Sequence, residues 1–156
     1  ELQTRAEPFA AHPHVFVSTP GHRLALRGHL SVEDLRPYDF IVREPGSGTR
    51  VAMEKFFAEA RVEPRLQMQL HSNETLKQAV MAGLGLGFVS LHTIGLELSQ
   101  GLIALLDVEG APVVRAWNVV HTQSKMLSPA AESFRYFMLE QGEKQLADQF
   151  GRFLPI

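Results

Sequence analysis

The chain has 156 residues, of which 45% are hydrophobic, and its 15 Lys and Arg are balanced by 17 Asp and Glu. This composition is that of a globular domain with a sizeable core, which argues against global disorder, and the net charge of −2 argues against a broadly basic nucleic-acid-binding surface. Since the sequence has no Cys, a disulfide scaffold, a Cys-ligated zinc site and a Cys nucleophile are excluded.

Strand-like runs recur along the chain. Val15–Val17 and Phe40–Val42 are short apolar runs, and Leu66, Met68 and Leu70 alternate with polar residues, as in a half-buried strand. Further strands are expected at 84–90, 103–106 and 113–121. No apolar run approaches the roughly 18–20 residues that span a bilayer, and no N-terminal stretch has the pattern of a secretory signal.

Helical patterns follow most of these strands. A face formed by Met53, Phe56, Phe57 and Ala60 indicates a helix after the second strand. Ser72 is a good N-cap for the next helix, which is expected to stop at Gly83. A capped turn is expected at 31–35, a short helix at 93–100, a C-terminal helix from the Ser128 cap to Gly142, and an amphipathic turn or tail at 146–153. This alternation predicts an α/β fold with a largely parallel sheet.

The segment between the second strand and its helix is the strongest candidate for a binding site. It reads Gly46-Ser47-Gly48-Thr49-Arg50. Backbone amides at a helix start, two hydroxyls and a guanidinium together suit a carboxylate or phosphate. The same pattern also fits a plain helix cap after a tight turn, with Arg50 in solvent.

Two further segments are expected beside that loop, because ligands of open parallel sheets bind outside the carboxyl ends of the strands. One is the helix start Ser72-Asn73-Glu74, which is also compatible with a simple N-cap. The other is the strand end at Phe88 and Ser90, where Ser90 is a more plausible ligand contact than a nucleophile.

Several catalytic and cofactor motifs are absent. The run from Gly83 to Phe88 follows a helix and lacks the third glycine of the dinucleotide fingerprint, so its glycines indicate close strand packing. His12 and His14 lack the spacing and neighbouring carboxylates of a metal site. No hydrolase motif surrounds any serine. We therefore expect no metal, no cofactor and no catalytic residue.

Several stretches of the sequence resemble a known family. From about Pro8 to Gly142 it is similar to the effector-binding domain of LysR-type transcriptional regulators. The stretches that carry the resemblance are 20–25, 30–35, 40–44, 47–50, 73–88, 128–131 and 134–138, of which 73–88 is the most specific. Within the family, 73–90 and 117–128 look most like the regulators of Calvin-cycle (RuBisCO operon) genes.

The resemblance implies a fold like a type 2 periplasmic binding protein, with one complete lobe, lobe II, and an incomplete lobe I. Residues 1–19 are expected to be a crossing strand of lobe I, 20–115 lobe II, and 116–156 the return strand and last helix. Because the chain starts at Glu1, we expect a longer protein that carries the family's helix-turn-helix and first half of lobe I. Phe134 and Phe137 are then expected to form an exposed apolar face.

The resemblance also implies a function. The chain is expected to sense a small anionic, phosphorylated metabolite that controls carbon-fixation genes, as part of a cytoplasmic homodimer or homotetramer that binds promoter DNA through the helix-turn-helix. Neither catalysis nor a membrane is expected. The effector-binding residues carried over are Gly46, Ser47, Gly48, Thr49, Arg50, Ser72, Asn73, Glu74, Phe88 and Ser90.

Two other functions use the same fold. A periplasmic solute-binding protein would share the architecture and carry a signal peptide instead of a helix-turn-helix. An enzyme would need a general acid or base in the cleft, for which Glu44 and Glu74 are the carboxylates near the Ser/Gly loops.

Overall fold

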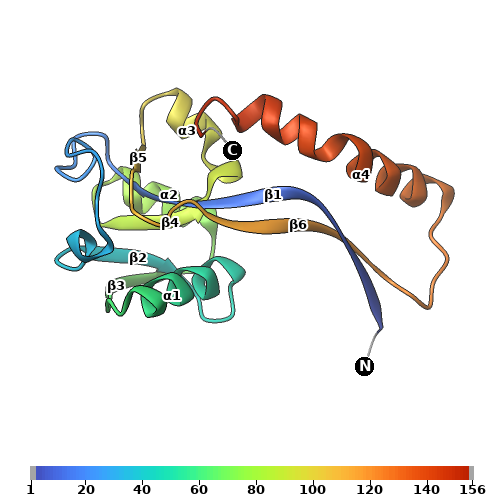
Figure 1. The fold of residues 1–156 in the computed structure, drawn as a ribbon, viewed down its shortest axis with the longest axis horizontal. Helices are drawn as coiled ribbons and strands as arrows, with labels where there is room; N and C mark the ends of the chain where they lie inside the picture. Colours follow the sequence, from blue (N-terminus) through green and yellow to red (C-terminus); the bar gives the residue numbers. More distant parts are fainter. Residues whose placement is uncertain (1–2, 155–156) are drawn as a thin grey trace. The chain divides into compact units, whose positions relative to one another are not determined.

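A computed structural model describes residues 3–154 (Figure 1). The chain divides into two compact units. Unit 2 is Pro13–Val114, and unit 1 combines the chain up to His12 with the chain from Arg115 onward. Strands β1 (Thr4–Ser18) and β6 (Val113–Thr122) run through both units and pair with each other.

Unit 2 contains a mixed sheet with the strand order β3-β2-β4-β1-β5. Strand β2 (Asp39–Arg43) is parallel to both β3 (Arg65–Leu70) and β4 (Leu86–Ser90). Strand β1 is antiparallel to β4 and to β5 (Ala104–Leu106). The expected largely parallel sheet is therefore correct for β2, β3, β4 and β5, which all run in the same direction. It is wrong for β1, because strand–helix alternation does not reveal the direction in which the first strand enters the sheet.

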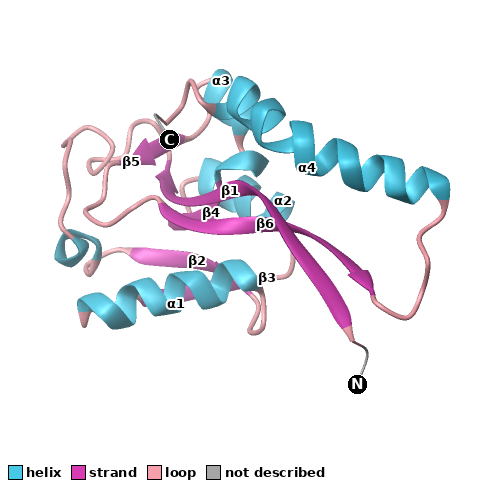
Figure 2. Cartoon of the chain, turned by 45° about the vertical axis from the view of Figure 1, so that its right-hand side comes forward, coloured by secondary structure: helices cyan, strands magenta, loops and turns pink. Residues whose placement is uncertain are grey.

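Helices α1 (Gly48–Ala60) and α2 (Asn73–Met81) cover opposite faces of this sheet (Figure 2). Phe16, Phe40 and Phe88 point to the α1 face, where they join Phe57 of α1 in one buried cluster. Phe40 and Phe57 meet edge to face at 5.3 Å between ring centroids, a favourable aromatic geometry. Strands β2 and β4 are thus buried on both faces, which explains their continuous apolar runs, whereas β3 is largely exposed.

The glycines at the start of β4 allow close approach of backbone and helix. A Cβ at Gly85 would lie 2.7 Å from the Asp39 carbonyl oxygen, and one at Gly87 would lie 2.8 Å from a Val80 methyl of α2. The strand-packing interpretation of this motif is confirmed, since neither position has room for a side chain.

The shorter elements follow the predictions with small differences. A 3₁₀ turn, Val32–Leu35, is closed by a capping box between Ser31 and Asp34. The helix predicted at 93–100 is divided into a 3₁₀ turn, Leu91–Thr93, and α3 (Gly95–Ser99), because Ile94 between them has non-helical dihedral angles.

Unit 1 contains the long helix α4 (Pro129–Phe150), which begins at the predicted Ser128 cap. The predicted stop at Gly142 is wrong, since α4 continues for two more turns. A Cβ at Gly142 would lie 2.6 Å from a ring carbon of Phe9, so this glycine permits close packing of α4 on β1. Phe134 and Phe137 are 61% and 49% exposed, as expected for an uncovered apolar face. Among the described residues, no helix is long and apolar enough to cross a bilayer.

Candidate functional site

The carboxyl ends of the three parallel strands meet at one edge of the unit 2 sheet, here called the carboxyl edge. It is formed by Arg43, Leu70 and Ser90, the last residues of β2, β3 and β4. The loops that leave it start α1 and α2. The two loops and the β4 end therefore lie at one edge, as the parallel registers require, and their shared role in binding stays a prediction.

The first turn of α1 differs from those of the other long helices, α2 and α4. Its N-cap, Ser47, has extended dihedral angles but its side chain makes no capping hydrogen bond, whereas Ser72 and Ser128 each accept one at α2 and α4. Gly46, just before it, has a φ of +86°, which turns the chain sharply into the helix. The α1 start is thus suited to an external acceptor, because amides of a first turn need one from some source.

Arg50 does not project into solvent. Its side chain is 11% exposed, with Nε 2.5 Å from the Glu54 carboxylate and Nη1 donating to the Arg43 carbonyl at 3.1 Å. The guanidinium therefore ties the first turn of α1 to the end of β2. This inward position depends on contacts with Arg43, seven residues earlier, and Glu54, four residues later. The loop motif alone therefore does not reveal it.

Arg43 links the two loops of the carboxyl edge. Its guanidinium forms two hydrogen bonds to the Glu44 carboxylate, at 2.8 and 2.9 Å, and a third to Oδ1 of Asn73 at the start of α2. The hydrogen bonds from Arg43 lower the pKa of Glu44 to about 2. Asn73, predicted as a site residue, thus contacts Arg43, a residue that the sequence reasoning missed.

The start of α2 is internally satisfied. Ser72 Oγ accepts a hydrogen bond from the Thr75 amide at 3.1 Å, as a plain N-cap does. The carboxylate of Glu74 lies 2.8 Å from the ammonium of Lys77, and this hydrogen bond lowers the pKa of Glu74. The α2 start therefore has a side-chain cap of its own, which the α1 start lacks.

The β4 end brings a buried histidine to the carboxyl edge. Ser90 is paired in register with His14 of β1, and the His14 ring stacks on Phe88 at 5.6 Å between centroids. His14 Nε2 lies 3.4 Å from Thr49 Oγ1 in the first turn of α1. His14 is fully buried, and only the antiparallel register of β1 places it here.

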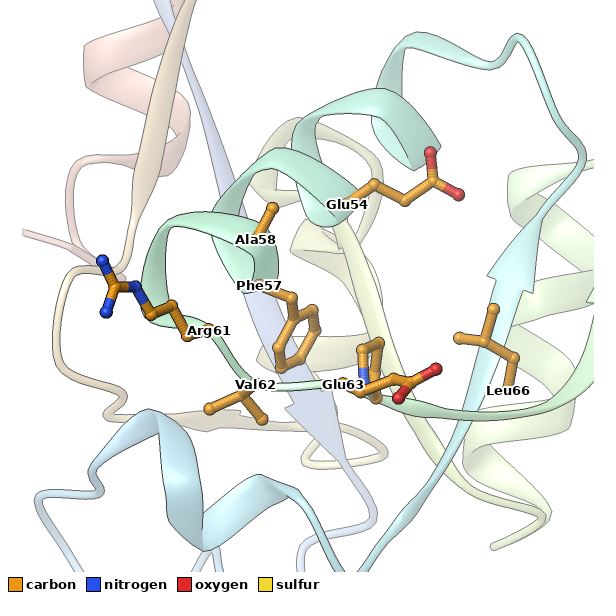
Figure 3. Close-up of a pocket in the computed structure, with 8 residues that line it drawn as sticks. Glu54, Phe57, Ala58, Arg61, Val62, Glu63 and Leu66 are labelled. Carbon is orange, nitrogen blue, oxygen red and sulfur yellow. The ribbon is translucent and has the colours of Figure 1, made fainter.

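A surface cavity of about 350 Å³ lies elsewhere on unit 2 (Figure 3). It is bounded by the last turns of α1 and the start of β3, at the amino ends of the parallel strands, and contains none of the predicted residues. Phe57 points into its centre, while the Arg61 head points away from the Glu63 carboxylate. Among residues 3–154, no group of three His, Asp or Glu side chains could hold a metal ion.

Comparison with known proteins identifies the family. Residues 2–143 match the model of the LysR substrate binding domain. The chain belongs to this family. This match confirms the predicted resemblance to LysR-type regulators and the predicted α/β fold class of this LysR substrate-binding domain.

Its similar curated proteins are transcriptional regulators. The domain is 48% identical to the HTH-type transcriptional regulator CfxR of Cupriavidus necator over 155 residues, which are 99% of this chain and 49% of that protein. It is 46% identical to a RuBisCO operon transcriptional regulator of Allochromatium vinosum, covering 92% of this chain and 47% of the relative. The chain spans about half the length of the curated relatives that it matches.

Solved structures extend the comparison. The regulatory domain of Synechocystis CcmR in complex with 2-PG is 32% identical, with a TM-score of 0.82, over 89% of this chain and 67% of that one. The effector-binding domain of QuiR, in complex with shikimate, shares the fold with a TM-score of 0.78 and 20% identity over 91% of this chain and 66% of that one.

Proposed function

We propose that this LysR substrate-binding domain is the effector-sensing part of a transcriptional regulator of carbon-fixation genes. Its effector is a small anionic, phosphorylated metabolite. The observation that carries the proposal is the α1 start at the carboxyl edge, whose N-cap Ser47 makes no capping hydrogen bond through its side chain. A phosphate oxygen is a suitable acceptor there, because first-turn amides and the helix dipole both favour negative charge.

Similarity supports the ligand class and the regulated genes. CcmR, 32% identical to this chain, is described in complex with 2-PG, a phosphorylated metabolite. Two of the similar proteins are named as RuBisCO operon regulators. The carried-over residues form the lobe II half of the effector site, with Gly46, Ser47, Gly48 and Thr49 at the anion and Arg50 holding the loop.

In this proposal, unit 2 corresponds to the effector-binding lobe II, and unit 1 to crossing strands and a helix of lobe I. Promoter DNA is bound by a helix-turn-helix outside this chain, in a cytoplasmic homodimer or homotetramer. The names of the similar proteins favour this regulator over a transport protein of the same fold.

The chemistry of the carboxyl edge supports binding without turnover. Glu44 is paired with Arg43 and Glu74 with Lys77, and both pairs lower the pKa of the carboxylate. A general acid near neutral pH needs a raised pKa instead, so neither glutamate is prepared for that role.

Calorimetric titration of the full-length protein with 2-PG tests the proposal through Ser47→Asp. An aspartate at the N-cap supplies its own carboxylate to the first turn, so stability should stay within about 1 kcal/mol of the parent protein. The added charge should weaken 2-PG binding at least about tenfold, because it repels an anion at the same amides.

Ser128→Asp is the matched control, since it makes the same substitution at the N-cap of α4 in unit 1. It should leave the affinity within about twofold. Equal affinity of Ser47→Asp and the parent protein would exclude the α1 start as the anion site. Failure of the parent protein to bind 2-PG or any other phosphorylated metabolite would overturn the ligand class.

A further inference from the structure

Lys77 is a buried cation on α2 that binds three segments of unit 2. Its side chain is 10% exposed, and its ammonium lies 2.8 Å from Glu97 of α3 and 2.8 Å from Glu74 in its own first turn. It also donates to the carbonyl of Thr93 at 3.1 Å, in the 3₁₀ turn after β4. All three ammonium hydrogens therefore have acceptors, each from a different turn.

The group is charged despite its burial. Desolvation alone would lower the pKa of Lys77, but the hydrogen bonds to Glu74 and Glu97 outweigh it, and the pKa is raised. The Glu97 side chain is 9% exposed, and its Oε2 is buried without a hydrogen-bond partner in the described part of the chain. A protein with apolar residues of similar size in place of a buried ion pair is often as stable as one with the pair. Stability alone therefore does not explain why Lys77 and Glu97 are buried together.

The third contact of Lys77 leads to the carboxyl edge. Thr93 Oγ1 donates to the Ser90 carbonyl at 2.8 Å, so two hydrogen bonds connect the Lys77 ammonium to the last residue of β4. Ser90 faces His14 in register, and His14 contacts Thr49 of the α1 start. Lys77 thus fixes the turn that follows β4 and, through it, the backbone beside the α1 first turn.

We propose that Lys77, neutralised by Glu97, is a positioning residue for effector binding: it holds the Ser90–Thr93 turn and Glu74 in place without touching the effector. The proposal rests on the proposed function, in which Ser90 and Glu74 belong to the effector site. Nothing in the sequence distinguishes Lys77 from a surface lysine, since Thr93 and Glu97, which its ammonium contacts, lie 16 and 20 residues further along the chain.

The double variant Lys77→Met/Glu97→Met separates positioning from stability. It removes both buried charges together, so no buried carboxylate is left unpaired, and Glu74, which also loses its partner, is 67% exposed to solvent. The variant should therefore fold with a melting temperature near that of the parent. Lys55→Met/Glu59→Met is the matched control. This pair lies on α1, is exposed at 76% and 69%, and is 3.8 Å apart.

Amide hydrogen exchange in the full-length protein tests the positioning without any ligand. In the double variant, the amides of 91–94 should exchange about tenfold faster, because the turn loses its anchor, while those of β2 stay unchanged. Exchange at 91–94 equal to that of the parent and the control would overturn the proposal, whether or not the protein binds 2-PG.

Titration with 2-PG then measures the effect on binding. The Lys77→Met/Glu97→Met protein should bind about 3- to 30-fold more weakly, as residues that act through others do, and the control should bind like the parent. Unchanged affinity in a protein with a loosened 91–94 turn would also overturn the positioning role. Absence of 2-PG binding by the parent is a failure of the proposed function, and the exchange result remains decisive for Lys77.

Discussion

Arg135 of α4 forms a bidentate ion pair with Glu7 of β1, with N–O distances of 2.5 and 2.6 Å. Both side chains are mostly buried within unit 1, at 13% and 18% exposure. A second carboxylate, Glu132, lies 2.9 Å from the same guanidinium. This contact joins segments near opposite ends of the chain and holds α4 against β1.

The stability of the protein should depend on Glu7 in acid. The hydrogen bond from Arg135 lowers the pKa of Glu7 below its ordinary value, so its stabilisation is complete above the unfolded value of about 4.3. It is lost as the pH falls through the lower folded value. In urea unfolding, Glu7→Gln should be less stable than the parent at pH 7, and the difference should shrink below pH 4. A difference that is constant from pH 7 to pH 3 would contradict the ion pair.

Gly142→Ala should destabilise the protein although alanine is the better helix former. The new Cβ would lie 2.6 Å from a Phe9 ring carbon, and such overpacking costs about 1–3 kcal/mol, partly offset by about 1 kcal/mol of helix propensity. Chemical unfolding measures the balance. Adding Phe9→Leu should recover part of the loss, whereas a stabilised Gly142→Ala protein would show that α4 does not pack this closely on β1.

Gly87→Ala should destabilise the protein, because the added methyl group would force α2 away from the sheet. Its Cβ would lie 2.8 Å from Val80 and 3.1 Å from Leu76, both fully buried, at a cost of about 1–3 kcal/mol. Gly21→Ala is the control, because nothing lies within 4 Å of a Cβ there. Equal unfolding midpoints for the two variants would show that β4 has room for a side chain.

Arg50→Ala should weaken binding of 2-PG by about 1–3 kcal/mol, the scale of a charged hydrogen bond. The reason is loss of the bond to the Arg43 carbonyl, which holds the loop that starts α1. Glu54→Gln, which leaves that bond in place, should have a smaller effect. Lys55→Ala removes an exposed cation from the same helix and controls for general electrostatics. Unchanged calorimetric affinity of a folded Arg50→Ala protein would remove Arg50 from the site.

The amino-acid sequence by itself determined the local features of the protein. The caps at Ser72 and Ser128, the strand at Phe40–Val42 and the packing role of the glycines before Phe88 were all predictable, and the structure confirms them. Each depends on hydrogen bonds or burial patterns within a few residues, so the local sequence contains the necessary information.

The tertiary structure alone decided how distant segments meet. In the tertiary structure β1 runs antiparallel to β4 and β5, α4 continues through Gly142, and the Arg50 side chain points inward. His14 lies at the carboxyl edge, and Lys77 contacts the turn that follows β4. Each of these outcomes depends on a partner remote in the sequence or on which face of a helix is covered. Packing against such partners outweighs local preference. Gly142 therefore lies inside a helix, in contact with β1, and the Lys77 side chain is buried.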